Sequence, residues 1–406
     1  MAGTRSGRWS RYAAVARRTW FSFSRTALAT HQAAVARMGF SLVFGAYLIR
    51  EWTHRRVLYG DRSPLSIELA QQFLSQRHGF TMFTWSTSRW WFESLYMAAI
   101  VVSVLLFLGW HTRTMSVLFM LMVLSVENRN MFVADGGDGV LHLMAIYLVL
   151  TRCGEVWSLD ARRRRRMPGG SADTRLPRSV PGRSGPVLWV LSGGLLACAQ
   201  LSGLSGGMLA WGAPTGWLSL HGWAAVLWTF WACAGLTYGF ERLNRNRDLQ
   251  AVLDGVGVMV HNCAMAVIAV EVCLIYSVAG WYKIQGPLWE DGTAVYYPLH
   301  LAYYSPWPAL SHALTADSHV VFLITYGTVL LQVAFPFLVF NSRCKKALLA
   351  ALMVEHTCMG VLLGLPFFSL AMIAADAVFL PTRSLLRAAE ALSRLRKRLI
   401  RQKTQR

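Results

Sequence analysis

The residue with the clearest capacity for chemistry is Lys283, which stands apart from the other lysines of the chain. The sequence has five lysines, and the other four lie in strongly basic segments. A lysine removed from water can lose its proton and act as a general base, whereas an arginine effectively cannot. Lys283 ends a long apolar segment and precedes a segment rich in Trp and Tyr. A second interpretation therefore stays open, in which its ammonium group reaches the lipid head groups beside an aromatic belt.

Three other polar side chains share a face with Lys283 if the apolar segment before it is one helix. A helical wheel of about 100° per residue groups four polar residues within about 60°. They are Asp254, His261, Tyr276 and Lys283. Val256 and Val267 fall on other faces of the same wheel. A polar stripe on an apolar helix predicts an inward face that lines a polar interior.

Other ionisable residues lie within or beside apolar runs, where charge is costly and usually faces the protein interior. In addition to Asp254, His261 and Lys283 of the stripe, they are Arg37, Glu127, Arg129, Asp138, Glu271, Glu355, His356 and Asp376. Asp138 follows the turn Gly136-Gly137 and enters the next apolar run. An alternative for each of these residues is that it pairs with another and fixes helix packing.

The composition predicts an all-α integral membrane protein rather than a soluble one. Of 406 residues, 54% are hydrophobic and 15% are charged, and the mean hydropathy is +0.37. Ordinary soluble domains carry roughly 25% charged residues. Ten apolar runs, each compatible with a membrane-spanning helix, predict a polytopic bundle of about ten spans without a large soluble domain.

The net charge of +20 comes mainly from short basic segments between and beside the apolar runs. A nucleic-acid-binding protein would instead carry such charge on a folded polar face, so nucleic acid is not an expected partner. Basic residues concentrate in a cytoplasmic tail (1–35), a flexible linker (160–186) and a second tail (381–406), the last an amphipathic helix. This is the positive-inside pattern, and it places both termini on the cytoplasmic side of the cell membrane. Membrane lipids are the expected partners. The membrane parts are 36–159, with four spans, and 187–380, which contains an outer aromatic loop at 283–318.

The seven cysteines include no Cys-x-x-Cys pair and mostly lie within apolar runs. We therefore expect neither a disulfide framework nor a metal site. Arg outnumbers Lys by 35 to 5, a bias typical of GC-rich bacterial genomes.

The order of the apolar runs and of the motifs between them resembles the HTTM family, and in particular its actinobacterial members. This family is the membrane domain shared with vitamin K-dependent gamma-carboxylase. The most specific element is the Ala-Gly-x-x-Lys pattern at 279–283. The other matching positions are Arg37, Arg129, Asn130, Gly136, Gly137, Asp138, residues 157–161, Trp289, residues 291–294, Tyr296, Tyr297, residues 364–370 and Asp376. The resemblance covers about residues 30–385.

This resemblance implies an enzyme in which Lys283 deprotonates a reduced vitamin K or menaquinone-type quinol. Oxygen then turns the quinol into a base strong enough to remove a glutamate γ-proton, and CO2 adds to the carbanion. Asp138 stands where the carboxylase has a histidine. The family also includes bacterial members associated with toxin maturation, so a non-enzymatic factor for peptide maturation or export remains the alternative. An internal repeat, which many transporters have, is not evident.

The charge asymmetry generates a topological prediction. In intact cells, an impermeant maleimide should label single cysteines introduced at 283–318, on a background without native cysteines. Cysteines introduced into the 160–186 linker should react only after lysis. Labelling of the linker in intact cells would contradict the predicted orientation.

Overall fold

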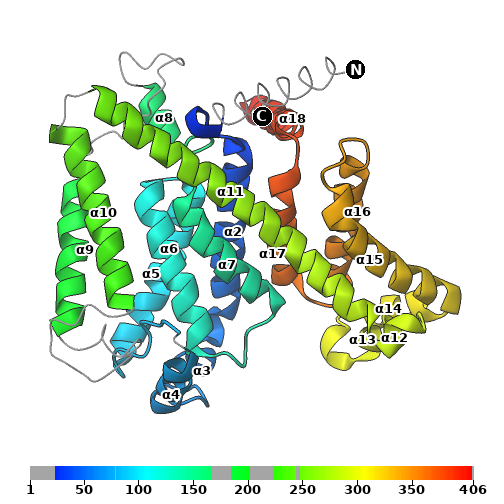
Figure 1. The fold of residues 1–406 in the computed structure, drawn as a ribbon. Helices are drawn as coiled ribbons and strands as arrows, with labels where there is room; N and C mark the ends of the chain where they lie inside the picture. Colours follow the sequence, from blue (N-terminus) through cyan, green and yellow to red (C-terminus); the bar gives the residue numbers. More distant parts are fainter. Residues whose placement is uncertain (1–22, 78, 167–183, 202–222, 244–246, 405–406) are drawn as a thin grey trace, which may run out of the picture. The chain divides into compact units, whose positions relative to one another are not determined.

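The computed structural model describes residues 23–77, 79–166, 184–201, 223–243 and 247–404, and these residues form helices and no strands (Figure 1). An all-helical fold is therefore confirmed for the described part of the chain. Helices suit a membrane because they satisfy their backbone hydrogen bonds within one segment. Both the first 22 residues and most of the basic linker, 167–183, lie outside the described residues.

A helix lies at each of the ten predicted apolar runs. They are α2 Thr30–Arg50, α5 Arg89–Leu108, α6 Thr112–Arg129, α7 Gly136–Leu150, α9 Ser184–Leu201, α10 Trp223–Leu243, α11 Arg247–Ile284, α15 Ser318–Leu338, α16 Lys345–Leu362 and α17 Pro366–Asp376. Within the described ranges, four helical segments are long and apolar enough to cross a membrane. They are Thr30–Thr53, Arg89–Leu108, Ala251–Ile284 and Ser318–Leu338, and a bent pair built on α17 could supply a fifth. The predicted number of ten spans is thus not confirmed.

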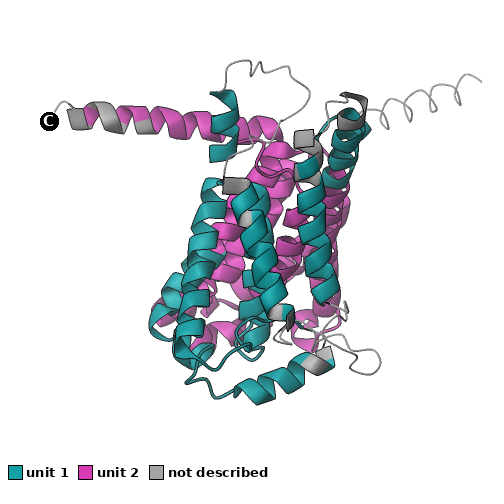
Figure 2. Ribbon diagram, turned by 90° about the vertical axis from the view of Figure 1, so that its left-hand side faces the viewer, with its two compact units in different colours: residues 1–27, 44–134, 157–261 teal, residues 28–43, 135–156, 262–406 magenta. Residues whose placement is uncertain are grey.

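The chain divides into two compact units, each assembled from three separate stretches (Figure 2). Unit 1 comprises residues 1–27, 44–134 and 157–261, and unit 2 comprises residues 28–43, 135–156 and 262–406. In unit 1, α5 packs against α6, and α9 packs against α10. In unit 2, α17 packs against both α16 and α7, and α15 packs against α16.

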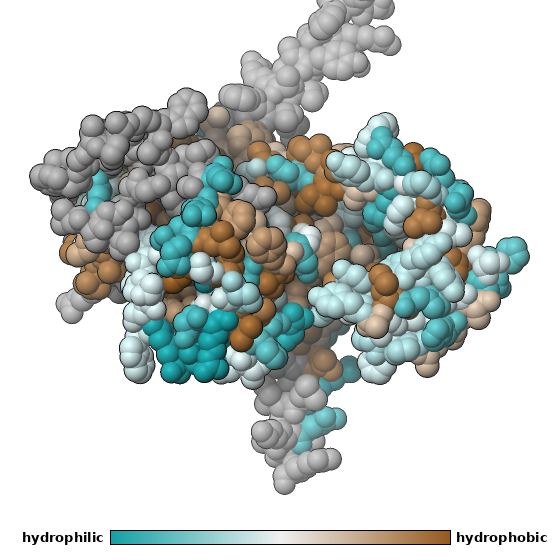
Figure 3. All heavy atoms as spheres, turned by 90° about the horizontal axis from the view of Figure 1, so that it is seen from below, coloured by the Kyte–Doolittle hydropathy of each residue, from teal (hydrophilic) through white to brown (hydrophobic). Residues whose placement is uncertain are grey.

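Large apolar side chains remain exposed along several helices. On α15, Leu323, Leu330 and Phe337 are each at least 70% exposed. Soluble proteins rarely expose contiguous apolar surface of this kind, whereas lipid-facing helices require it. Seen from below (Figure 3), by contrast, the molecule shows many hydrophilic side chains with hydrophobic ones between them.

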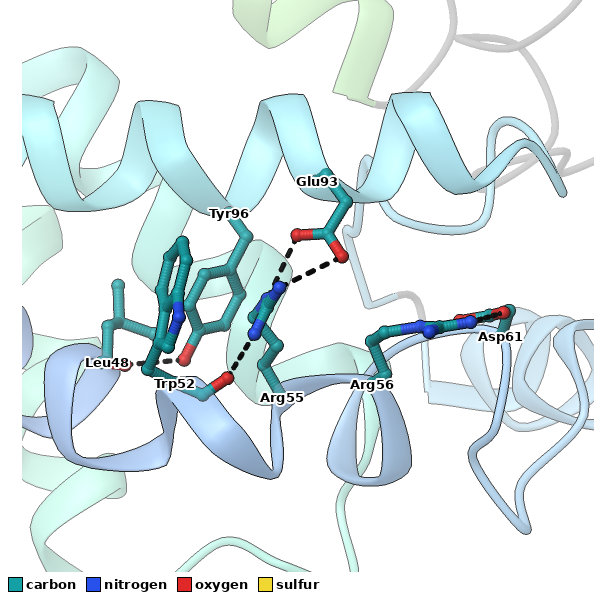
Figure 4. Close-up of polar contacts among 7 residues, drawn as sticks. All are labelled: Leu48, Trp52, Arg55, Arg56, Asp61, Glu93 and Tyr96. Atoms are coloured by element: carbon teal, nitrogen blue, oxygen red, sulfur yellow. Dashed lines mark hydrogen bonds and ion pairs between the residues drawn. The ribbon is translucent and has the colours of Figure 1, made fainter.

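Residues 51–93, which follow the first apolar run, fold into η1 Glu51–Thr53, α3 Arg55–Leu58, α4 Ile67–Arg77 and the start of α5. Arg55 holds Glu93 through two hydrogen bonds of 2.9 and 3.2 Å and lies over the Trp52 ring (Figure 4). Arg56 pairs with Asp61, and this hydrogen bond lowers the pKa of the Asp61 carboxyl. The pair therefore persists until the pH falls below the ordinary carboxylate range.

The arginines of this segment are an exception to the predicted charge asymmetry. With the N-terminal tail in the cytoplasm, a first span ending near residue 50 would place residues 50–93 outside, where the rule disfavours their six arginines. Three of the six are paired with carboxylates, at distances of 2.5 to 2.9 Å. Long translocated segments follow the charge rule poorly, so these arginines do not decide the predicted orientation.

The start of the predicted flexible linker is in fact helical, because Ser158 caps a short helix, α8 Leu159–Arg165. Asp160 on α8 accepts hydrogen bonds from the backbone N–H groups of His111 and Thr112 and from the Thr112 hydroxyl, at 3.1, 2.8 and 2.7 Å. The Asp160 N–H group also donates to the Gly109 carbonyl. Because α6 has no cap of its own, Asp160 supplies the acceptors that its first turn requires.

Two other predicted segments differ from the structure. The aromatic loop at 283–318 contains the short helices α12 Pro287–Glu290, α13 Tyr296–His300, η2 Ala302–Tyr304 and α14 Pro308–Thr315. The basic tail predicted to end at residue 35 already enters α2 at Thr30. The predicted C-terminal helix is confirmed as α18, Thr382–Thr404.

Replacing Asp160 tests its role as a cap. Asp160→Ala should lower the free energy of unfolding by about 2 kcal/mol, because it leaves several donors at the start of α6 without an acceptor. Asp160→Asn keeps one acceptor oxygen and should cost less. SDS titration of the purified variants in mixed micelles measures both. If Asp160→Ala were as stable as the wild type, the hydrogen bonds of Asp160 would not stabilise the start of α6.

Candidate functional site

Tyr276 is the centre of a buried hydrogen-bonded group in unit 2. Its hydroxyl lies 2.9 Å from Asp376 Oδ2 and 2.8 Å from His356 Nε2. Helices α11, α16 and α17 supply these three side chains, and each is at most 2% exposed. The Tyr276 ring also packs on Phe335 of α15, with ring centroids 4.3 Å apart. One tyrosine thus ties four helices of this unit together.

The two contacts of the Tyr276 hydroxyl have complementary roles. The Tyr276 hydroxyl donates to the Asp376 carboxyl, so its oxygen is free to accept from His356. Donation from His356 Nε2 requires a proton on that nitrogen, and in the neutral imidazole this leaves Nδ1 as an acceptor.

Lys283 begins a second chain of hydrogen bonds. Its Nζ lies 2.8 Å from Gln332 Oε1, and Gln332 Nε2 lies 2.9 Å from Glu355 Oε1. The same ammonium or amine lies 5.2 Å from the centroid of the Trp289 ring. The Gln332 amide is oriented by both contacts, since it accepts from Lys283 and donates to the Glu355 carboxyl.

The hydrogen bonds around Tyr276 and those of the Lys283–Gln332–Glu355 series meet on α16, where Glu355 and His356 are consecutive residues. Glu355 also interacts electrostatically with Tyr276 and Asp376. We refer to these residues together as the polar network. Its members are Tyr276, Lys283, Gln332, Glu355, His356 and Asp376.

Several buried atoms in and beside the polar network have no hydrogen-bond partner. They are Glu355 Oε2, His356 Nδ1, Asp376 Oδ1 and Ser369 Oγ. An unpartnered buried polar atom costs about 1–3 kcal/mol, and such groups usually contact an ordered water or a polar ligand. These four atoms leave the network able to contact a polar occupant.

Close helix packing brings the donors and acceptors of the network together. At Gly280, one turn before Lys283, an added Cβ would lie 2.8 Å from Val333 Cγ2 on α15. At Gly39 on α2, an added Cβ would lie 2.5 Å from the Cβ atom of Ala374, close to Asp376 on α17. Larger side chains at either position would separate the helices that hold the network.

The stripe predicted on α11 has the helical continuity that it requires. The helix runs unbroken from Arg247 to Ile284, so the predicted helix at 252–283 is confirmed. On it, His261 is buried like Tyr276, Asp254 is partly buried like Lys283, and Val256 and Val267 are exposed. The functional roles of Asp254 and His261 stay predictions.

Other candidate residues form hydrogen bonds outside the polar network. In unit 1, Arg129 is buried and donates to the backbone carbonyls of Gly60 and Leu65, and its neighbour Asn130 donates to Leu58. These bonds hold the end of α6 against the turn after α3.

In unit 2, Arg37 is fully buried and donates to the Cys153 carbonyl. Asp138 forms a capping box with Asp135 at the start of α7, where its side chain accepts from the Asp135 N–H group. Glu271 accepts a hydrogen bond from Tyr147. These contacts hold helix ends and helix pairs, and the functional roles of these residues stay predictions.

Sequence reasoning missed Gln332. The residue is uncharged, so a search for ionisable groups passed over it, although a single amide within the apolar run of α15 was a usable signal. No group of three or more potential metal ligands occurs among the residues that the structure describes. Comparison with protein-family models, curated proteins and solved structures finds no significant match to this chain.

Removing the Tyr276 hydroxyl tests the centre of the network. Tyr276→Phe should lower the free energy of unfolding by about 2 kcal/mol, because Asp376 and His356 both lose a buried partner. Tyr303→Phe is the matched control, since Tyr303 is 87% exposed and should tolerate the same change. Equal effects of the two substitutions, measured by SDS titration, would contradict a stabilising role for the network.

Proposed function

We propose that the chain is a polytopic protein of the cell membrane, of the HTTM type, that uses Lys283 as a general base toward a quinol. The proposal includes the ten-span arrangement with both termini and the 160–186 linker in the cytoplasm. It also includes a reaction like that of vitamin K-dependent gamma-carboxylase, with a peptide glutamate as the second substrate.

The observation that carries the proposal is the Lys283–Gln332–Glu355 chain. A lysine that only reached toward head groups would need no amide and no carboxyl partner inside the protein. Here Nζ is partly buried and oriented by Gln332 at 2.8 Å. An oriented amine is what proton abstraction requires, because a general base must lie within hydrogen-bond reach of the proton that it takes.

Glu355 gives this arrangement a way to stabilise the product of proton transfer. When the Lys283 amine accepts a proton, it becomes an ammonium group, and the Glu355 carboxylate interacts favourably with that charge. Gln332 separates the two groups, so the proton does not pass directly from the carboxyl to the amine. Gln332 is therefore a positioning residue.

The residues around Lys283 fit a quinol. Quinol hydroxyls are hydrogen-bond donors, and Glu355 Oε2 is a buried acceptor without a partner. The Trp289 ring lies beside Nζ, and Trp281 and Tyr282 are 61% and 72% exposed on the last turn of α11. Aromatic rings of this kind pack well on a flat quinol ring. When bound, the quinol would supply the oxygen-dependent chemistry, while the chain orients it and accepts its proton.

The test is oxygen-dependent consumption of a reduced naphthoquinone by purified protein in nanodiscs. Lys283→Arg should abolish turnover, because arginine keeps the charge but cannot accept a proton. Gln332→Leu should lower kcat roughly tenfold or more by releasing the amine from its orientation. A base placed for this reaction contributes about 10²–10⁴-fold in rate.

Lys345→Arg is the matched control. Lys345 is also partly buried beside an aromatic ring, 5.8 Å from the centroid of Phe379, but lies outside the polar network. Its substitution should leave turnover unchanged. Equal turnover of wild type and Lys283→Arg would refute the base. Absence of turnover in the wild type with both vitamin K and menaquinone analogues would favour a non-enzymatic maturation or export factor.

A further inference from the structure

Helix α18 separates apolar from basic side chains along its length, and the proposed reaction does not use it. A helical wheel places its leucines roughly opposite its basic residues. The leucine face comprises Leu385, Leu386, Leu392 and Leu395. The basic face comprises Arg383, Arg387, Arg394, Lys397 and Arg398. This arrangement is typical of helices that lie in a membrane interface.

Most of the leucine face has no partner within the described structure. Leu386, Leu392 and Leu395 are 41%, 67% and 54% exposed, and only Leu385 is buried. Figure 2 shows α18 extending away from the other helices of unit 2. Burying three leucines fully would contribute several kcal/mol, so their exposure to water is unfavourable and a covering surface is expected.

The corner before α18 sets its direction. Helix α17 and the η3 turn that follows it, Ala377–Phe379, meet α18 at a bend of 119°, roughly 30° past a right angle. Pro381 precedes α18, and Gln32 of α2 donates to both the Leu380 carbonyl and the Thr382 hydroxyl across this corner. If α17 enters the bilayer, a helix turned through this angle runs close to the plane of its surface.

We propose that α18 lies along the cytoplasmic membrane surface and binds the head groups of anionic lipids. Its leucine face enters the acyl region while its basic face contacts the phosphates. The positive charge of α18 favours anionic lipid as the bound partner. The described part of the helix has a single acidic residue, Glu390, which pairs with Arg394 at 3.6 Å. Each basic side chain near an anionic surface contributes roughly a fivefold factor in binding.

Spin labels on the full chain in nanodiscs test the placement. On a background without native cysteines, Leu392→Cys reports the leucine face and Glu390→Cys reports the polar face. In bilayers with anionic lipid, the Leu392 label should be reached by oxygen and shielded from a water-soluble nickel chelate. The Glu390 label should show the reverse. In zwitterionic bilayers the contrast between the two labels should fall severalfold.

Charge variants test the head-group contact. Replacing Arg383, Arg387, Arg394 and Lys397 with Gln should remove the difference between anionic and zwitterionic bilayers. Glu390→Gln, the matched control on the same helix, should enlarge it because Arg394 loses its ion pair. A Leu392 label open to the chelate in every bilayer would overturn the membrane placement. A label shielded from both reagents would overturn it too, in favour of a protein partner or a second copy. Identical insertion with and without anionic lipid would overturn the head-group contact.

Discussion

The hydroxyl of Tyr276 is the contact on which the interior of unit 2 depends. Inside an apolar bundle, a carboxyl and an imidazole need polar partners, and one hydroxyl serves both at 2.8 and 2.9 Å. Because Asp376, His356 and Tyr276 come from three helices, the requirement to satisfy them fixes the relative rotation of those helices. That rotation also places Glu355, the neighbour of His356, where Gln332 can link it to Lys283.

The network combines two needs that usually conflict. Burial strengthens electrostatic interactions, yet it makes every unsatisfied polar atom costly. Tyr276, Asp376 and His356 contact one another through one atom each, namely the Tyr276 hydroxyl, Asp376 Oδ2 and His356 Nε2. Glu355 Oε2, His356 Nδ1 and Asp376 Oδ1 have no partner within the described structure. A scaffold built only for stability would more often replace such groups with apolar side chains. Their retention suits a site that receives a donor from outside the chain.

Sequence patterns predicted single helices better than the contacts between them. The 3.6-residue period was enough to place Tyr276 and Lys283 on one face of α11, because both belong to one continuous helix. Their partners on α15, α16 and α17 depend on packing between helices that are far apart in the sequence. Such contacts leave no periodic pattern in a single sequence. Gln332 is a different case, because a single amide within an apolar run is visible in the sequence and a search restricted to ionisable residues passes over it. The motif around Asp160 was noticed as a resemblance, whereas its physical role, the capping of α6, required the structure.

The central claim is that the polar network faces a bound quinol, and photocrosslinking tests it most directly. A photoreactive menaquinone analogue would be irradiated with the purified protein in nanodiscs, with and without excess unlabelled menaquinone, and the attachment sites mapped by mass spectrometry. The account predicts competed crosslinks within residues 276–289 and 332–356. Competed crosslinks confined to other helices, or crosslinks that unlabelled menaquinone does not reduce, would contradict it.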